Sequence, residues 1–247
     1  MITFDNVWFW QEEKPVLKGI NLSIRSDERV AILGPSGAGK TTILKLILGL
    51  SPPDSGRVLI NNNDIGSLKE DLLIKERLKF SIVFQEGALF DSLSVRDNVA
   101  FYFTEHTSLS IDQIDEQVAI LLKTVDLEEA GELMPEQLSG GMKRRVAIAR
   151  SLAVSEAKMN LYDEPTSGLD PVNVEIIRSL IMQLASNGKG FIVVTHEILD
   201  ALTIALRFMF LKDGIILFDG DKQGFLKTEV PQVKEFLRPY QYILQRL

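Results

Sequence analysis

The fold of this chain is decided by one stretch of its sequence, Gly34-Pro35-Ser36-Gly37-Ala38-Gly39-Lys40-Thr41-Thr42. An apolar run over 30–33 precedes this stretch, and a helix-forming run over 43–48 follows it. The order strand, glycine-rich loop, helix is the one that a phosphate-binding loop (P-loop) requires. The glycines let the backbone curl so that several N–H groups face one anion, and the helix adds its positive N-terminal end. An ordinary glycine-rich turn is the weaker alternative, because every fixed position of the motif is filled.

Two side chains of the loop carry the chemistry of a bound nucleotide. The ammonium group of Lys40 reaches the β- and γ-phosphates in such loops, and the hydroxyl group of Thr41 holds Mg²⁺. We therefore expect residues 34–42 to bind ATP with Mg²⁺, and we expect Lys40 to act in catalysis as well.

Length and composition limit the alternatives. The 247 residues suffice for one large α/β domain or for one domain with an inserted subdomain. The formal net charge of −7 argues against nucleic acid as a partner, because nucleic-acid binders carry a basic surface. The chain has no cysteine, which excludes disulfide scaffolds and thiolate metal sites. No apolar run approaches the ~20 residues that span a bilayer, so we expect any membrane role to come through a partner.

The pattern of strands and helices divides this single domain into a core and an insertion. We expect the core to comprise residues 1–85 and 156–225, because the alternation of strand and helix resumes near Lys158. The mostly helical pattern of the sequence between them predicts an inserted helical subdomain over 86–155. The C-terminal extension is 226–247, and we expect its part from Pro231 onward to be partly helical and to leave the core.

Five further motifs follow the loop. They are Gln85 at the end of an apolar strand, Leu138-Ser139-Gly140-Gly141-Met142 at the start of a helix, Leu161-Tyr162-Asp163-Glu164 at the end of a strand, Ser167-Gly168-Leu169-Asp170, and Val193-Val194-Thr195-His196. With these motifs the chain resembles the nucleotide-binding subunit of an ATP-binding-cassette (ABC) transporter from about residue 2 to residue 225. The signature over 138–142, together with the two Walker motifs, is highly specific to that family. The resemblance implies an α/β ATPase with a P-loop NTPase (RecA-like) core of mainly parallel strands, an N-terminal antiparallel β-subdomain and an inserted α-helical subdomain.

Three side chains at strand ends are candidates for the site: Asp163 as a ligand of Mg²⁺, and Glu164 and His196, with Lys40, as catalytic residues. Asp163 is expected on a strand beside the P-loop strand, where a carboxylate is placed to hold Mg²⁺; the alternative is an acidic helix cap. The resemblance makes Glu164 the group that polarises the attacking water, and the alternative is a surface carboxylate. It also implies that His196 contacts the γ-phosphate, although a lone histidine at a strand end is more often structural.

The signature predicts a second phosphate-binding turn. Ser139, Gly140 and Gly141 stand at a helix N-terminus, which attracts anions as the P-loop does. The resemblance implies that this turn covers the γ-phosphate bound to a second copy of the chain, in a head-to-tail dimer that requires ATP. It places Asp170 at the same interface. The following run Lys143-Arg144-Arg145 is expected to be a solvated helix face.

The segment that begins at Gln85 is expected to connect the ATPase to a membrane protein. The resemblance implies that Gln85 ligates Mg²⁺ and that residues 86–95 form part of a groove for a helix of the transmembrane permease. We therefore expect permease subunits to dock near residues 86–106, although ordinary subdomain core accounts for some of these side chains. Docking on a permease implies that this chain is cytoplasmic and lies peripherally on the cytoplasmic face of the inner membrane.

The sequence departs from the family pattern at four positions: Gln11, Asn160, Met142, where glutamine is commoner, and Glu197, where aspartate is usual. Family members usually stack adenine on an aromatic side chain near the end of the first strand, and that position is Gln11 here. Trp10 and Phe9 are adjacent, and we expect Trp10 to take the role, although side-chain alternation turns only one of the two toward the base. Asn160 interrupts the apolar run before Asp163, which predicts a local cost in stability.

Two of the motifs point to a branch of the family. Residues 85–90 and 138–145 resemble the ATPases of Mla-type phospholipid transporters, which work with a lipid-binding MCE-domain partner. The resemblance implies that this chain powers lipid transport. The main alternative is the ATPase subunit of another ABC importer or exporter, such as an importer of polar amino acids. A soluble ABC-type switch protein is the third reading, and the absence of zinc cysteines and of tandem ATPase domains argues against it.

Overall fold

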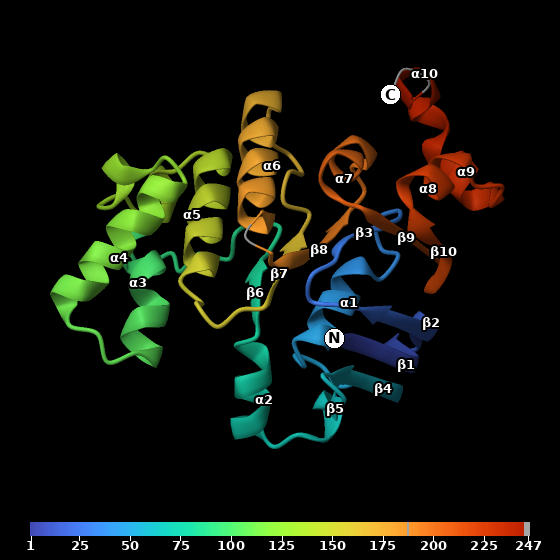
Figure 1. Ribbon diagram of the computed structural model, residues 1–247, viewed down its shortest axis with the longest axis horizontal. Helices are drawn as coiled ribbons and strands as arrows, with labels where there is room; N and C mark the ends of the chain where they lie inside the picture. The colour runs from blue at the N-terminus through green and yellow to red at the C-terminus, as the bar shows by residue number, and fades with distance from the viewer. Residues whose placement is uncertain (187, 245–247) are drawn as a thin grey trace.

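A six-stranded sheet forms the centre of the molecule, and the computed structural model describes residues 1–186 and 188–244 (Figure 1). In spatial order its strands are β10 (Ile215–Asp221), β9 (Arg207–Lys212), β3 (Arg29–Leu33), β8 (Gly190–Thr195), β7 (Met159–Asp163) and β6 (Phe80–Val83). All neighbours are parallel except β9 and β10, which form an antiparallel hairpin. Strands β7 and β8 are buried along their whole length, as expected for parallel strands that are covered on both faces.

The strand order corrects one expectation, because Asp163 does not lie on the strand next to the P-loop strand. Strand β3 pairs with β8 and β9, whereas β7 pairs with β6 and β8. Sequence order does not determine the neighbours of a strand in such a sheet, since a crossover can carry the chain past one strand. The three strands are parallel, so their carboxyl ends still meet at one edge of the sheet.

A second, antiparallel sheet is built mainly from the N-terminal residues. Its strands, in spatial order, are β2 (Lys14–Ile24), β1 (Ile2–Gln11), β4 (Ser55–Ile60) and β5 (Asn63–Asp64). Helix α1 (Lys40–Ile47) joins the two sheets, because Ile43 and Leu44 share one buried cluster with Phe4 of β1 and Ile32 of β3. Figure 1 shows α1 between β3 and this second sheet. The P-loop helix is thus fixed by apolar packing on both sides.

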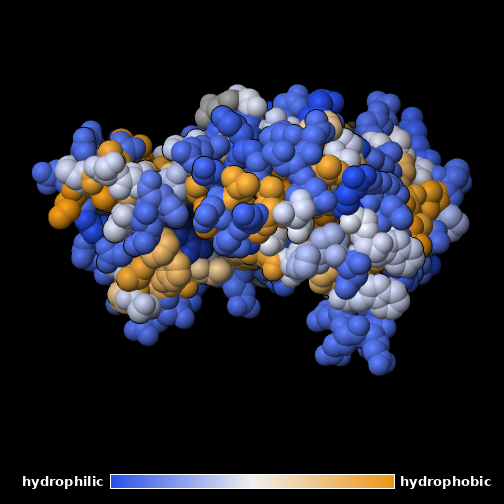
Figure 2. Space-filling view, turned by 90° about the horizontal axis from the view of Figure 1, so that it is seen from below, coloured by the Kyte–Doolittle hydropathy of each residue, from blue (hydrophilic) through white to orange (hydrophobic). Residues whose placement is uncertain are grey.

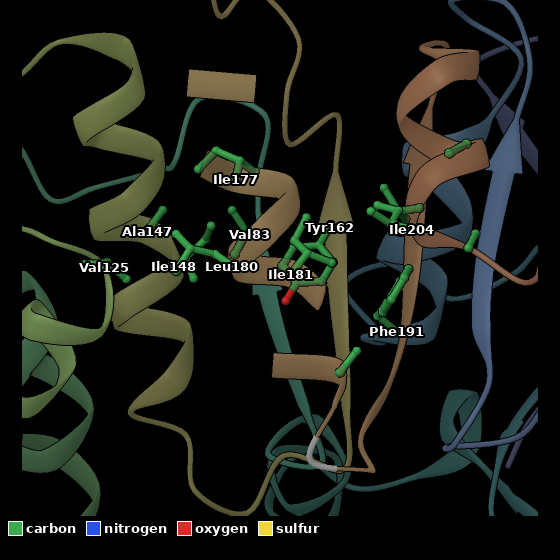
Figure 3. Packing of buried hydrophobic residues seen from close by; sticks show 14 of the residues in the cluster. Val83, Val125, Ala147, Ile148, Tyr162, Ile177, Leu180, Ile181, Phe191 and Ile204 are labelled. Carbon is green, nitrogen blue, oxygen red and sulfur yellow. The ribbon is translucent and has the colours of Figure 1, made fainter. Parts of the chain in front are cut away.

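Helices cover the other face of the central sheet and extend beyond its β6 edge. They are α3 (Val95–His106), α4 (Ile111–Thr124), α5 (Gly140–Leu152), α6 (Pro171–Ala185) and α7 (Ile198–Ile204), with short 3₁₀ turns at Glu128–Ala130 and Pro135–Gln137. Helix α2 (Glu70–Arg77) lies on the side of α1, where its Leu73 joins the buried cluster of the second sheet. Figure 3 shows Ile148 of α5, Ile181 of α6 and Tyr162 of β7 in one continuous core. In the described part of the chain, no helix combines the length and the apolar character needed to cross a membrane. The predicted fold class, a parallel core with an antiparallel sheet and a helical insertion, is confirmed.

The C-terminal part does not leave the core as expected. After α8 (Lys222–Lys227) comes α9 (Pro231–Leu237), whose residues Val233 and Leu237 are buried in the main cluster. The ring of Phe236 packs on Phe210 of β9, with centroids 5.0 Å apart. Apolar residues at 233, 236 and 237 follow helical spacing and fix α9 to the sheet. A 3₁₀ turn (Arg238–Tyr240) and α10 (Gln241–Leu244) follow, and residues 245–247 of the predicted extension lie outside the described residues.

Candidate nucleotide-binding and catalytic site

The loop between β3 and α1 is a tight turn that only glycines allow. The backbone φ is +157° at Gly34, +78° at Gly37 and +103° at Gly39, a region that other residues rarely adopt. A Cβ atom on Gly34 would lie 2.0 Å from the carbonyl oxygen of Leu211, so the backbone of β9 also requires glycine there. The loop is therefore held in its curled form by the sheet itself.

Lys40 places a buried ammonium group at the centre of this loop. Its Nζ atom donates to the carbonyl oxygens of Gly34 at 2.9 Å and Pro35 at 3.1 Å. The same Nζ lies 3.4 Å from Oε1 of Glu164, and both side chains are almost entirely buried. A positive charge inside a concave loop of backbone N–H groups is a site suited to an anion such as a phosphate.

Oxygen atoms beside the loop form a set suited to a hard divalent cation. The Thr41 hydroxyl donates to Oδ1 of Asp163 at 3.0 Å, which joins the start of α1 to the end of β7. Burial raises the pKa of the Asp163 carboxyl, while the hydrogen bond from Thr41 and the charge of Lys40 act in the opposite direction. Gln85 lines the same cavity as Thr41. Hydroxyl, carboxylate and amide oxygens are the ligands that Mg²⁺ prefers, so the donor set fits this ion.

Glu164 is held in place by β8, by His196 directly after it, and by the P-loop helix. Its φ of +46° is left-handed, and its N–H donates to the carbonyl oxygen of Val194 on β8 at 2.9 Å. Its Oε2 atom accepts from the Thr195 hydroxyl at 3.0 Å and from the N–H of His196 at 3.3 Å. Its Oε1 atom lies 2.9 Å from Nδ1 of His196. A strained backbone of this kind is typical of functional sites, because the surrounding contacts must hold it.

A cavity of about 250 Å³ lies at the P-loop. Its wall is formed by Gln11, Val16, Ser36, Gly37, Gly39, Lys40, Thr41, Thr42, Gln85 and Glu164. Trp10 is not part of this wall; the residue is 43% exposed, and its backbone N–H donates to Asp54 Oδ2. Stacking of adenine on Trp10 stays a prediction. Val16 was not predicted from the sequence, because an ordinary strand valine carries no signal of a ligand.

The signature turn and Asp170 lie at a different place, where both adjoin Asn173 of α6. Ser139 caps α5 by accepting from the N–H of Met142 at 3.2 Å. Asp170 caps α6 and accepts from the side-chain amide of Asn173 at 2.5 Å. A Cβ atom on Gly141 would lie 2.1 Å from Oδ1 of Asn173, so the glycine permits this close approach of α5 and α6.

The structure therefore gathers the predicted residues into two groups. The first group surrounds the 250 Å³ cavity, and Asp163 and His196 adjoin it through Thr41 and Glu164. No residue of the signature turn 139–141 lines this cavity among the described residues. Gly140 instead borders a larger cleft of about 650 Å³, whose wall comes from residues 85–91, 135–144 and 167–169. One copy of the chain thus does not bring its own signature turn to its own P-loop.

The expectation of a solvated face at Lys143-Arg144-Arg145 is wrong for two of the three residues. Arg144 is only 6% exposed and donates to the carbonyl oxygen of Phe84 at 2.8 Å, directly before Gln85. Arg145 donates to the carbonyl oxygens of Val125 and Asp126. Guanidinium groups bury well where they satisfy free carbonyl oxygens, and a sequence does not reveal where those carbonyls lie.

Other buried polar contacts were also missed from the sequence. Asn160 does not leave a polar gap in β7, because its Oδ1 accepts from the Ser81 hydroxyl of β6 at 2.7 Å. Arg150 of α5 donates to the carbonyl oxygens of Gly87 and Ala88, at 2.8 Å and 2.7 Å. The segment after Gln85 is therefore attached to the helix that carries the signature.

Comparison with known proteins agrees with this geometry. The model of the ABC transporter family matches residues 17–167. The ATP-binding protein MlaF of an intermembrane phospholipid transport system in Haemophilus influenzae is 37% identical over 96% of this chain and 90% of its own. The chloroplastic protein TRIGALACTOSYLDIACYLGLYCEROL 3 of Arabidopsis thaliana is 41% identical over 91% of this chain and 69% of its own. A dimeric, post-hydrolysis ATP-binding cassette bound to ADP and Pi has a TM-score of 0.82 and 36% identity, over 90% of this chain and 98% of that one.

This chain belongs to the ABC transporter family. It is an ATP-hydrolysing subunit and binds ATP. Cassettes of this kind form dimers and work with transmembrane permeases.

The left-handed backbone of Glu164 gives a test of strain that is independent of activity. Glu164→Gly and Glu164→Ala both remove the carboxylate, but only glycine accepts this φ without steric cost. We expect the glycine variant to have the larger free energy of unfolding, by about 1 kcal/mol, in urea titrations of the nucleotide-free protein.

The control is the same pair of substitutions at Gln183, an exposed position inside α6. There the order should reverse, because glycine weakens a helix interior by about 1 kcal/mol relative to alanine. Equal stability of the two Glu164 variants, with the control reversed as expected, would contradict a strained backbone at this residue.

Proposed function

We propose that this chain hydrolyses ATP to power phospholipid transport through a membrane partner. The ATPase part rests on one arrangement: Glu164 lines a glycine-built cavity and contacts both Lys40 and His196. The phospholipid part is supported by the match to MlaF, which covers nearly the whole of both chains.

The residues that would hold the nucleotide follow from the donor types. The N–H groups over 34–42 and the ammonium group of Lys40 would hold the phosphates, while Thr41, Gln85 and Asp163 would hold Mg²⁺. Lys40 now donates to two carbonyl oxygens of its own loop, and in the loaded site it exchanges them for phosphate oxygens. When bound, the metal ion would neutralise the negative charge that develops on the phosphate oxygens.

Glu164 and His196 have separate tasks in the hydrolysis. The water oxygen forms a bond to the γ-phosphorus while the bond from that phosphorus to the bridging oxygen of ADP breaks. The Glu164 carboxylate orients the water and accepts its proton, because it is the carboxylate that lies beside Lys40 at the phosphate-binding loop. The Nδ1 contact of His196 with Glu164 sets the orientation of the imidazole, which is thereby placed to reach the γ-phosphate.

The cavity is completed by a second copy of the chain. Ser139, Gly140, Gly141 and Asp170 lie away from the P-loop of their own chain, so they would close over ATP bound to the neighbour in a head-to-tail dimer. The solved cassette with the TM-score of 0.82 is dimeric and bound to ADP and Pi, which supports this arrangement. Two turns of N–H donors would then face the same phosphates from opposite sides.

Replacement of the proposed base separates binding from turnover. We expect Glu164→Gln to lower ATP turnover by at least ~100-fold, because the amide accepts no proton from water. ATP should still bind and should now trap the dimer, which size-exclusion chromatography with ATP detects.

The control variant is Glu116→Gln, an exposed carboxylate of α4, which should turn over ATP at the wild-type rate. Wild-type turnover by Glu164→Gln would remove Glu164 from this role.

We propose that permease subunits dock near residues 86–106. Phe90 and Phe101 are about 40% exposed, and their rings lie 4.6 Å apart. Beside them a groove of about 540 Å³ runs between α3 and α4 and includes Leu93, Phe101 and Ile111. Figure 2 shows hydrophobic side chains on the underside of the helical end of the molecule. Such a surface is suited to an amphipathic helix of a partner, which would hold the chain peripherally on the cytoplasmic face of the inner membrane.

The lipid substrate and an MCE-domain partner are testable together. When the tagged chain is extracted from membranes in detergent, we expect mass spectrometry to detect a permease, an MCE-domain protein and retained phospholipid. Phe101→Asp should lose all three while keeping ATP turnover, because a charge in the groove opposes apolar docking. Co-purification of a receptor for polar amino acids, without phospholipid, would contradict lipid transport and favour the importer alternative.

A further inference from the structure

A buried carboxylate on α7 connects three elements behind the catalytic cluster. Asp200 is 8% exposed, and both of its oxygens are engaged. Oδ2 accepts from the Thr166 hydroxyl in the loop after β7, and Oδ1 accepts from Nη2 of Arg178 on α6. Thr166 is itself 4% exposed, so water does not substitute for this hydrogen bond in the folded chain.

The positions of these residues in the chain relate Asp200 to the catalytic candidates. Thr166 follows Glu164 by two residues, and Asp200 follows His196 by four, about one turn of helix. The carbonyl oxygen of Glu164 accepts from the N–H of Ser167, and that of Thr166 accepts from the N–H of Leu169. Thr166 is therefore part of the turn that shapes both Glu164 and the loop leading to Asp170.

Asp200 forms an ion pair with one cationic side chain. Arg178 is its cationic partner, and the Nε atom of Arg178 is buried without a hydrogen-bond partner among the described residues. Glu175 also contacts Arg178, at 3.4 Å, but its side chain is exposed. Tyr240 and Glu197 also face this region. Burial, together with the negative charges of Glu197 and Asp200, raises the pKa of Tyr240. A buried charge with one cation and one hydroxyl is costly to assemble, which points to a role beyond packing.

We propose that Asp200 is a positioning residue, which fixes the Glu164 turn against the helix that follows His196 through its bond to the Thr166 hydroxyl. Glu164 and His196 then keep their relative position through two connections, the direct Nδ1–Oε1 contact and the Asp200–Thr166 bond. The same Asp200–Thr166 bond also fixes the loop that leads to Asp170. The position of Asp170 at the proposed dimer interface is thereby coupled to the position of the Glu164 carboxylate. This inference rests on the proposed function, in which Glu164 orients the water.

The test removes the hydroxyl without changing the shape of the side chain. Thr166→Val is nearly isosteric and leaves Asp200 paired with Arg178 alone. We expect its kcat for ATP to fall ~10-fold or more, because small displacements of a catalytic group are costly, while the Kd for ATP stays within about twofold of wild type. Thr166→Ser, which keeps the hydroxyl, should restore at least half of the wild-type kcat, and Asp200→Asn should resemble Thr166→Val.

The matched control is Glu175→Gln, which removes the exposed carboxylate on Arg178 and should leave kcat unchanged. Wild-type kcat in Thr166→Val overturns the inference. So does a Thr166→Ser variant as slow as Thr166→Val, because the hydroxyl would then not matter. Parallel losses of ATP binding and thermal stability in Thr166→Val also overturn it, since they show a purely structural role. Wild-type protein without ATP hydrolysis would instead refute the proposed function itself, so the two failures are distinguishable.

Discussion

The structure depends on a buried carboxylate, Glu164, which is held between a lysine, a hydroxyl and an imidazole. These partners come from different parts of the chain: Lys40 begins α1, Thr195 ends β8, and His196 follows it. They meet because the strands are parallel and end at one edge of the sheet, which is where ligands bind in folds of this kind. The left-handed backbone of Glu164 is maintained by this cluster together with the Val194 hydrogen bond.

The same geometry makes each copy incomplete. The cavity at the P-loop has donors on one side only, because the signature turn of the same chain borders the separate 650 Å³ cleft. Arg144 and Arg150 attach the segment around Gln85 to the signature helix, so a shift of α5 is passed directly to this segment. These hydrogen bonds join the helix that carries the signature turn to the segment that leads into the proposed docking region.

The sequence was sufficient for features that depend on local pattern. Fixed spacing predicted the P-loop, the signature turn and the strand-end carboxylates, and alternation of strand and helix predicted the fold class. Contacts between distant segments were missed: Arg144 reaches Phe84, and β8 separates β7 from β3. Helix α9 was assigned to the exterior although its apolar spacing contained the signal of a packed face. Partners of buried polar groups depend on tertiary structure, and one sequence does not specify them.

Mixing two inactive variants tests most directly whether an active site is shared between copies. Lys40→Ala lacks a working P-loop, and Ser139→Trp blocks the signature turn, so each alone should hydrolyse almost no ATP. In a mixed head-to-tail dimer, one of the two sites combines the intact P-loop of the Ser139→Trp copy with the intact signature turn of the Lys40→Ala copy. About half of the dimers in an equal mixture are mixed, so about a quarter of all sites should be active. ATP turnover that appears on mixing is the predicted result. Turnover by Ser139→Trp alone at the wild-type rate, or none after mixing, would contradict the account.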